Sequence, residues 1–236
     1  MSSGGVPVVN TPIDLDNQTV RQRNQPVFSH TGRLILFDDF TDGIDAWWRT
    51  NNQTVWSSEL SYGKGYCCRM QSTAAVSTII QHYFPGNLPI AYPKTGIELS
   101  FYCLTGALQI GIELTHNINN VDTHAAIWFN FDAAMYSDTT LQLMGTNNNV
   151  ITLETPLNFS REVIHRVKLV ADFSSKKYDK LYLDDSVYDL SQWNLYDIPG
   201  WGSNYNVLRA MVTNAPRLAT GGYSYIPYII ITDTEP

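Results

Sequence analysis

Apolar and polar residues alternate along residues 166–190, which predicts two antiparallel strands joined by a short polar turn. Residues 174–177, Ser-Ser-Lys-Lys, supply the turn. A period of two places one face of each strand against a core and the other face against water. The expected inward positions are Val167, Leu169, Ala171 and Phe173 in the first strand, and Leu181 and Leu183 in the second.

The same period recurs along much of the chain, at residues 97–103, 108–115, 126–131 and 208–213. We expect the first two of these segments to pair as a hairpin closed by Thr105 and Gly106. Residues 191–205 lack a period and contain Pro199-Gly200, so we expect a loop there. Many short strands at regular spacing predict an all-β sandwich or barrel. Further inward positions are Phe101, Ile110, Ile112 and Phe129.

Three segments share features with one β-sandwich superfamily. Asp172-Phe173 ends the first strand of the hairpin, and Tyr-x-x-Leu-Tyr-Leu-Asp-Asp follows at residues 178–185. Residues 34–48 combine a strand, an Asp-Gly turn and a Trp, and residues 223–236 look like a closing strand. Together they resemble the concanavalin A-like jelly rolls: legume lectins, laminin G-type domains and laminarinase-like glucanases. The resemblance implies an all-β, two-sheet antiparallel jelly-roll sandwich over residues 34–236. That scaffold serves many functions, so function must be argued from sites.

Composition agrees with one folded β domain and narrows the choice of partners. The chain of 236 residues is 44% hydrophobic and 16% charged, which favours a packed core over disorder. The net charge of −7 argues against nucleic acid as a partner. No apolar run approaches the roughly 18 to 20 residues that cross a bilayer. The first residues lack the pattern of a secretory signal, so we expect a protein that is used without export.

The three cysteines predict buried thiols. Cys67 and Cys68 are adjacent, and neighbours in one strand point to opposite faces, so they do not readily pair with each other. A bridge from either of them to Cys103 is the alternative. Without an exported context we favour the free thiols.

Residues 1–33 differ from the rest of the chain and predict an extended N-terminal arm. Pro7, Pro12 and Pro26 interrupt the segment, and it lacks the alternation of a core strand. The arm either packs across its own sandwich or lies on a neighbouring subunit, and we favour the second arrangement. The apolar anchors would be Val8, Val9, Ile13, Leu15 and Val20.

The carboxylates do not form a recognisable catalytic pattern. Laminarinase-like relatives carry Glu-x-Asp-x-Glu on one strand, which places nucleophile and acid on the same face. Here Glu98 and Glu113 stand singly on separate strands, and we expect both to be solvated edge or turn residues. In the adjacent pairs Asp38-Asp39 and Asp184-Asp185, the two side chains should point in different directions, so they should not act together. We therefore expect no enzymatic activity.

Metal ligands are equally sparse, so we expect no metal and no cofactor. The five histidines lack zinc spacing, although His116 and His124 could approach each other. Relatives of the jelly-roll superfamily use calcium, and Asp39 could meet Asp233 where the first and last strands adjoin. Asp is common in turns, which makes this calcium site the weaker interpretation.

The strand pattern also predicts a candidate glycan-binding patch. Trp128 and Asn130 lie on the polar phase of their strand, and Tyr102 and Glu113 lie on the polar phases of the two preceding strands. An aromatic ring covers the apolar face of a sugar while amides bind its hydroxyls. The alternative, which we favour from the sequence, is that Trp128 belongs to the core. For Trp193 and Trp201 the same two alternatives stand, contact with a glycan or a place in the core.

The sequence as a whole favours a non-catalytic structural or accessory subunit of a larger assembly. We expect a phage virion protein, such as a capsid decoration (cement) or tail component, bound by its arm to protein subunits of that assembly. The alternative is a carbohydrate-binding module or lectin-like domain, in the cytoplasm or outside the cell.

Overall fold

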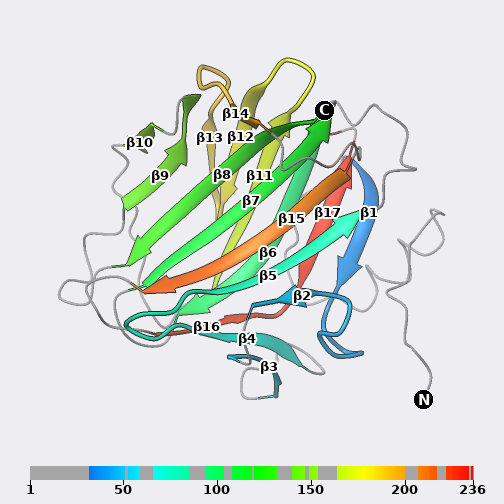
Figure 1. Cartoon of the computed structure of the whole chain (residues 1–236), viewed down its shortest axis with the longest axis vertical. Helices are drawn as coiled ribbons and strands as arrows, with labels where there is room; N and C mark the ends of the chain where they lie inside the picture. The colour runs from blue at the N-terminus through cyan, green and yellow to red at the C-terminus, as the bar shows by residue number, and fades with distance from the viewer. Residues whose placement is uncertain are drawn as a thin grey trace.

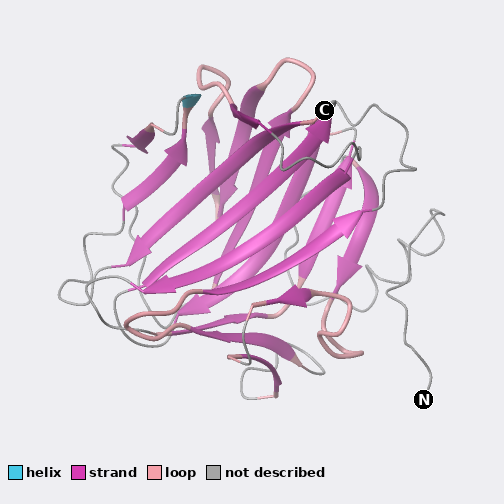
Figure 2. Cartoon of the chain, viewed as in Figure 1, coloured by secondary structure: helices cyan, strands magenta, loops and turns pink. Residues whose placement is uncertain are grey.

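The computed structural model places two antiparallel β-sheets face to face, which confirms the predicted all-β sandwich (Figures 1 and 2). Among the described residues, no helix is long and apolar enough to cross a membrane. The predicted arm and its five anchors lie outside the described residues. The structure describes residues 32–50, 53–58, 66–84, 94–103, 108–118, 120–131, 140–146, 149–153, 164–199, 207–216, 222–233 and 235.

The nine-stranded sheet has the order β13-β12-β11-β6-β16-β4-β3, and β17 lies between β6 and β1. All of its pairs are antiparallel. Its strands are β1 (Arg33–Asp38), β3 (Thr54–Ser57), β4 (Cys67–Gln71), β6 (Lys94–Cys103), β11 (His165–Asp172), β12 (Lys177–Leu183), β13 (Ser186–Asp189), β16 (Tyr223–Ile226) and β17 (Ile229–Asp233).

The eight-stranded sheet has the order β10-β9-β8-β7-β15-β5-β2. Strand β14 pairs with the start of β8, and β9 pairs with its later part. The strands are β2 (Trp48–Arg49), β5 (Thr78–Phe84), β7 (Leu108–Ile118), β8 (Val121–Phe131), β9 (Thr140–Met144), β10 (Val150–Leu153), β14 (Tyr196–Pro199) and β15 (Val207–Pro216).

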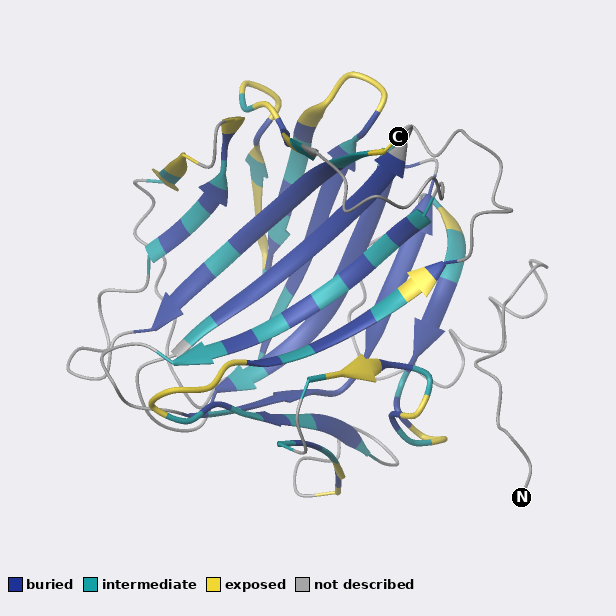
Figure 3. Ribbon diagram, viewed as in Figure 1, coloured by how far each residue is buried: buried dark blue, intermediate teal, exposed yellow. Residues whose placement is uncertain are grey.

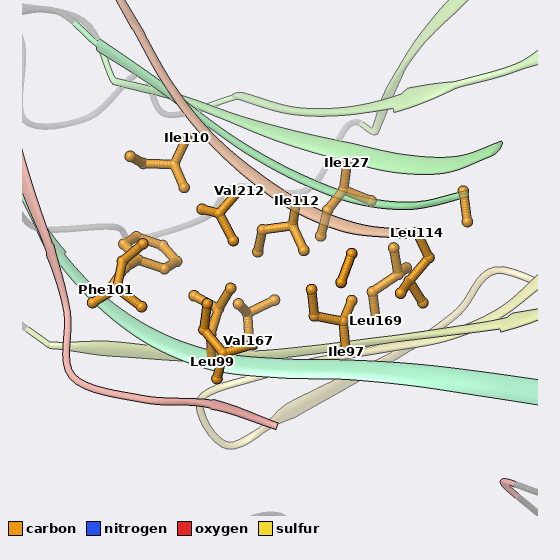
Figure 4. Close-up of a cluster of buried hydrophobic side chains, with 14 of the residues drawn as sticks. Ile97, Leu99, Phe101, Ile110, Ile112, Leu114, Ile127, Val167, Leu169 and Val212 are labelled. Carbon is orange, nitrogen blue, oxygen red and sulfur yellow. The ribbon is translucent and has the colours of Figure 1, made fainter. Parts of the chain in front are cut away.

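The core fills the space between the two sheets (Figure 4). Every inward position expected from the alternation is buried, from Phe101 and Leu169 at 0% exposed to Phe173 at 6%. Phe101 of one sheet packs against Phe129 of the other, with ring centroids 5.4 Å apart. Alternating buried and partly exposed bands along β15 make the same period visible in Figure 3. The predicted phase of these strands is therefore confirmed.

Three more expectations are confirmed. The hairpin of residues 166–190 is β11 and β12, with Leu169 opposite Leu181. The last strand, β17, returns beside the first strand, β1. All three cysteines are buried thiols.

Two expectations about connections are wrong. Segments 97–103 and 108–115 do not form a hairpin, because β6 belongs to the nine-stranded sheet and β7 to the eight-stranded sheet. Residues 191–205 are not simply a loop, because β14 pairs with β8 through Tyr196 opposite His124. In both cases the local period does not specify which distant strand supplies the hydrogen-bonding partner.

The outer face of the nine-stranded sheet is buried where the alternation predicts contact with water. Lys168 is 2% exposed and Glu98 is 1% exposed, so the expectation that Glu98 is solvated is wrong. Lys168 Nζ lies 2.7 Å from Glu235 Oε1. A buried charge is tolerated when it is paired in this way.

Candidate functional site

The strongest candidate site is the outer face of the eight-stranded sheet, which we define as the side chains of that sheet that point away from the core. Neighbouring strands bring these side chains into rows. On β7 and β8, the register sets Gln109 opposite Asn130, Gly111 opposite Trp128, Glu113 opposite Ala126 and Thr115 opposite His124.

The rows continue over β15 and β5 to the sheet edge at β2. Arg209 of β15 lies opposite Thr115 on one side and Tyr83 on the other. Met211 lies between Glu113 and Gln81, and Gln81 pairs with Trp48 of β2. The outer face thus combines aromatic, amide and charged groups drawn from five consecutive strands.

Trp128 is an outer-face residue, so the expectation that it belongs to the core is wrong. Its side chain is partly exposed, whereas Ile127 and Phe129 on either side are 0% exposed. The indole lies over Gly111: a Cβ atom at that position would stand 2.8 Å from Trp128 Cδ1 and 3.0 Å from Nε1. The missing side chain of Gly111 therefore lets the indole approach the backbone of β7.

The amides beside Trp128 hold one another in place. Gln109 Nε2 donates to Asn130 Oδ1 at 2.7 Å, and Asn130 Nδ2 donates to Thr140 Oγ1 at 3.3 Å. Asn130 is 1% exposed, whereas Gln109 is partly exposed. Asn130 therefore orients Gln109, and Gln109 is the amide that a ligand could contact.

A charged cluster lies one row beyond Trp128. Glu113 Oε1 accepts hydrogen bonds from Thr115 Oγ1 at 2.7 Å, His124 Nδ1 at 2.8 Å and Arg209 Nη2 at 2.7 Å. Burial alone would raise the pKa of Glu113, but the hydrogen bond and charge of His124, the Arg209 charge and Thr115 together lower it. Glu113 is 9% exposed, so the expectation that it is solvated is wrong.

This cluster suits binding and orientation better than nucleophilic catalysis. The Thr115 hydroxyl donates to the Glu113 carboxylate and lies 3.1 Å from the same His124 Nδ1 that donates to that carboxylate. A nucleophile–histidine–acid relay needs one ring nitrogen for the hydroxyl and the other for the acid. His124 also stacks on Tyr196, with ring centroids 4.7 Å apart, which fixes the imidazole.

On the described strands β7 and β8, the spacing of the outer-face carboxylates does not match that of a glycosidase either. Asp122 is the other carboxylate on the outer face of β7 and β8. It lies four residues from Ala126, the partner of Glu113, which is about 13 Å along a strand. Glycosidases hold their two carboxyl groups about 5 to 9.5 Å apart.

The structure brings together three of the four residues proposed for glycan binding: Trp128, Asn130 and Glu113. Tyr102 lies on β6 of the other sheet, where its ring meets Tyr225 edge-on at 6.2 Å. Sequence reasoning missed Arg209, Tyr83 and Trp48. The polar phase of β15 already pointed to Arg209, but only the register shows that it reaches Glu113.

The metal interpretations receive no support among the described residues, where no group of three or more His, Cys, Asp or Glu side chains could hold an ion. Asp39 and Asp233 lie near opposite ends of the β1–β17 pair, and Asp233 binds Arg33 at 2.5 Å. His116 faces the core and contacts Phe173, whereas His124 faces outward. Trp193 is partly exposed and packs against the core, and Trp201 lies outside the described residues.

Comparisons with known proteins bear on the fold. No family model and no curated protein matches the sequence. Among solved structures, a carbohydrate esterase from the Shiga toxin-encoding bacteriophage phi24B has a TM-score of 0.57 at 12% identity, over 86% of this chain and 100% of that one.

Two other solved structures extend the likeness to a glucanase and a lectin. The catalytic domain of a laminarinase from Thermotoga petrophila has a TM-score of 0.51 at 11% identity, over 86% of this chain and 99% of that one. Peanut lectin has a TM-score of 0.50 at 12% identity, over 84% of this chain and 96% of that one. The scaffold is thus shared by enzymes and by a lectin, and the protein has the concanavalin A-like jelly-roll fold.

Proposed function

We propose that the protein is a non-catalytic carbohydrate-binding protein whose ligand lies on the outer face of the eight-stranded sheet. The observation that carries this proposal is the partly exposed Trp128 ring, held over Gly111 beside the oriented amide of Gln109. A flat ring covers the apolar face of a sugar, and an amide both donates to and accepts from sugar hydroxyls.

The length of the outer face suits an extended glycan rather than a single sugar. From β8 to β2 there are four strand-to-strand steps, or about 19 Å at about 4.8 Å each. Aromatic rings stand at both ends, with Trp128 at one and the exposed Trp48 and Tyr83 at the other. The side chains between them, Gln81, Met211 and Thr213, are mixed polar and apolar, which fits a ligand with alternating hydroxyls and C–H faces.

The charges favour a neutral glycan. The Arg209 guanidinium is already paired with Glu113 at 2.7 Å, so the cluster does not present an uncompensated cation for a uronate or sulfate. An acidic polysaccharide would also be repelled by a chain with net charge −7.

Affinity electrophoresis in gels containing laminarin, mixed-linkage glucan, xylan or glucomannan tests the proposal. We expect at least one neutral polysaccharide to retard the protein, and Trp128→Ala to abolish that retardation while the protein stays folded. Val187→Ala is the matched control, because Val187 is 60% exposed on β13 of the other sheet. Equal retardation of the Trp128→Ala variant would overturn the assignment to this face.

The same preparations test the absence of catalysis. Incubation with each retained polysaccharide should release no reducing ends. Release that disappears in the Glu113→Gln variant would show an enzyme in place of a binding protein.

A second candidate is an accessory subunit of a phage virion, for which glycan binding could serve attachment. Its support is the proline-interrupted segment 1–33 and the match to a bacteriophage protein over that protein's whole chain. Deleting residues 1–25 should leave the melting temperature nearly unchanged and abolish incorporation into particles. A large fall in melting temperature with normal incorporation would instead show an arm that packs on its own sandwich.

A further inference from the structure

A pocket lies just beyond the β2 edge of the outer face, between the loop that follows β1 and strand β3. Its volume is about 410 Å³. Trp48 of β2 pairs with Gln81 of the outer face, whereas Arg49, which lines the pocket, pairs with the core residue Ile80, so the pocket lies around the β2 edge from Trp48. Its lining includes Asp42, Ile44 and Asp45 of the loop, Arg49 of β2, and Val55 and Trp56 of β3.

The loop that forms one wall is fixed at both ends by a single buried carboxylate. Asp38 Oδ1 accepts the backbone N–H of Phe40 at 2.8 Å, and Asp38 Oδ2 accepts Trp47 Nε1–H at 2.6 Å. Phe40, Ile44 and Trp47 are buried and anchor the loop to the core. The polar residues between these anchors are therefore held in place before any ligand arrives.

Trp56 forms the opposite wall as a fixed, exposed aromatic surface. Its ring stacks on Tyr66, with centroids 3.7 Å apart and planes inclined by 20°. Its Nε1–H donates to the carbonyl oxygen of Phe40 at 2.7 Å, which ties it to the loop. Trp56 is nevertheless 45% exposed. An aromatic ring held in this way can stack on a ligand with little loss of conformational freedom.

The polar groups of the pocket suit hydroxyl groups. Asp42 is exposed, and a carboxylate accepts two hydroxyl hydrogens at once. Asp45 pairs with Arg49 at 3.3 Å on the surface, which supplies acceptors and donors side by side. The Arg49 charge disfavours a bare cation, and none of the described residues forms a metal cluster here. A polyhydroxylated ligand with an apolar face, which is a sugar, matches the lining.

We propose that this pocket is an end subsite that binds the sugar residues of a glycan that continues past Trp48 and turns around the β2 edge. The inference rests on the proposed function and adds a second binding region to it. Trisaccharides held at Trp128 would be too short to reach the pocket across a face of about 19 Å. A hexasaccharide spanning the face would engage both regions.

Isothermal titration with trisaccharides and hexasaccharides of the retained polysaccharide tests this inference. We expect Trp56→Ala to weaken hexasaccharide binding about tenfold, the effect of about 1.4 kcal/mol, and to leave trisaccharide binding unchanged. Asp42→Asn, at an exposed loop position that should not disturb folding, should weaken hexasaccharide binding in the same selective way. Trp128→Ala should abolish binding of both, and Val187→Ala should change neither.

The possible failures can be told apart. If both pocket variants bind the hexasaccharide as tightly as the wild type, the end subsite is overturned while the proposed function stands. If Trp56→Ala weakens both oligosaccharides equally and Asp42→Asn has no effect, Trp56 acts through the fold and the subsite is again overturned. If no polysaccharide retards the wild type and it binds no oligosaccharide, both proposals fall.

Discussion

The indole of Trp128 lies across Gly111, its direct partner on the neighbouring strand, with room for a hydrogen atom but not for a methyl group. The contact is made on the side of the sheet that faces away from the core. It couples the identity of residue 111 to the position of the ring that we assign to ligand binding.

Gly111→Ala should therefore impair binding more than stability. The new methyl group would stand 2.8 Å from Trp128 Cδ1 and force the indole to move. We expect polysaccharide retention to fall sharply, while the free energy of unfolding changes by about 1 kcal/mol or less, since Ala is otherwise better than Gly in a strand. Tryptophan fluorescence reports the position of the indole, denaturant titration gives the free energy of unfolding, and gel retardation measures polysaccharide binding, all on one preparation. Unchanged fluorescence and retardation would show that the methyl group neither moves the ring nor impairs binding.

Phe173→Ala should destabilise the sandwich by about 3 to 5 kcal/mol, as for other buried aromatic residues. Phe173 is 6% exposed and its ring meets His116 edge-on at 5.5 Å. Urea titration compared with Val187→Ala, which should stay within about 0.5 kcal/mol of the wild type, gives the measurement. A loss below about 1 kcal/mol would mean that the cavity collapses or that the side chain is not buried.

Lys168→Met should cost about 3 to 5 kcal/mol, because it leaves the Glu235 carboxylate buried without its cation. The two side chains are 2% and 3% exposed, and their charged atoms lie 2.7 Å apart. The double variant Lys168→Met, Glu235→Gln removes both charges and should recover part of the loss. Chemical denaturation of the wild type, the Lys168→Met and Glu235→Gln single variants and the double variant forms the cycle, and additive losses would contradict direct coupling.

The free energy of unfolding should depend on pH through the protonation of Glu113. Its pKa in the folded protein lies below the ordinary value of 4.5: burial raises the pKa, but His124, Arg209 and Thr115 together outweigh burial. A lowered folded pKa stabilises the fold above pH 4.5, and this contribution is lost as the pH falls through the folded pKa. The difference in unfolding free energy between wild type and Glu113→Gln should therefore shrink below pH 4.5. A difference that grows toward acid pH would reverse the assigned direction.

The sequence by itself determined where the strands with a clear period of two lie and which of their side chains point inward. Successive side chains of a strand alternate between faces, so a local period of two already assigned Leu169, Leu181 and Phe101 to the core. The short turn between β11 and β12 likewise left only one arrangement for that hairpin. These features depend on neighbours in sequence, which a single chain displays directly.

Tertiary structure decided which strands share a sheet and what covers each outer face. Alternation along β6 and β7 is the same whether they pair or separate, so Tyr102 could be assigned to the wrong group. The contact between Arg209 and Glu113 joins residues 96 positions apart and exists only through the register of β15 on β7. A period of two says that the faces of a strand differ, but not whether the polar face meets water. That depends on long-range packing, which is why Glu98 is buried and Trp128 partly exposed.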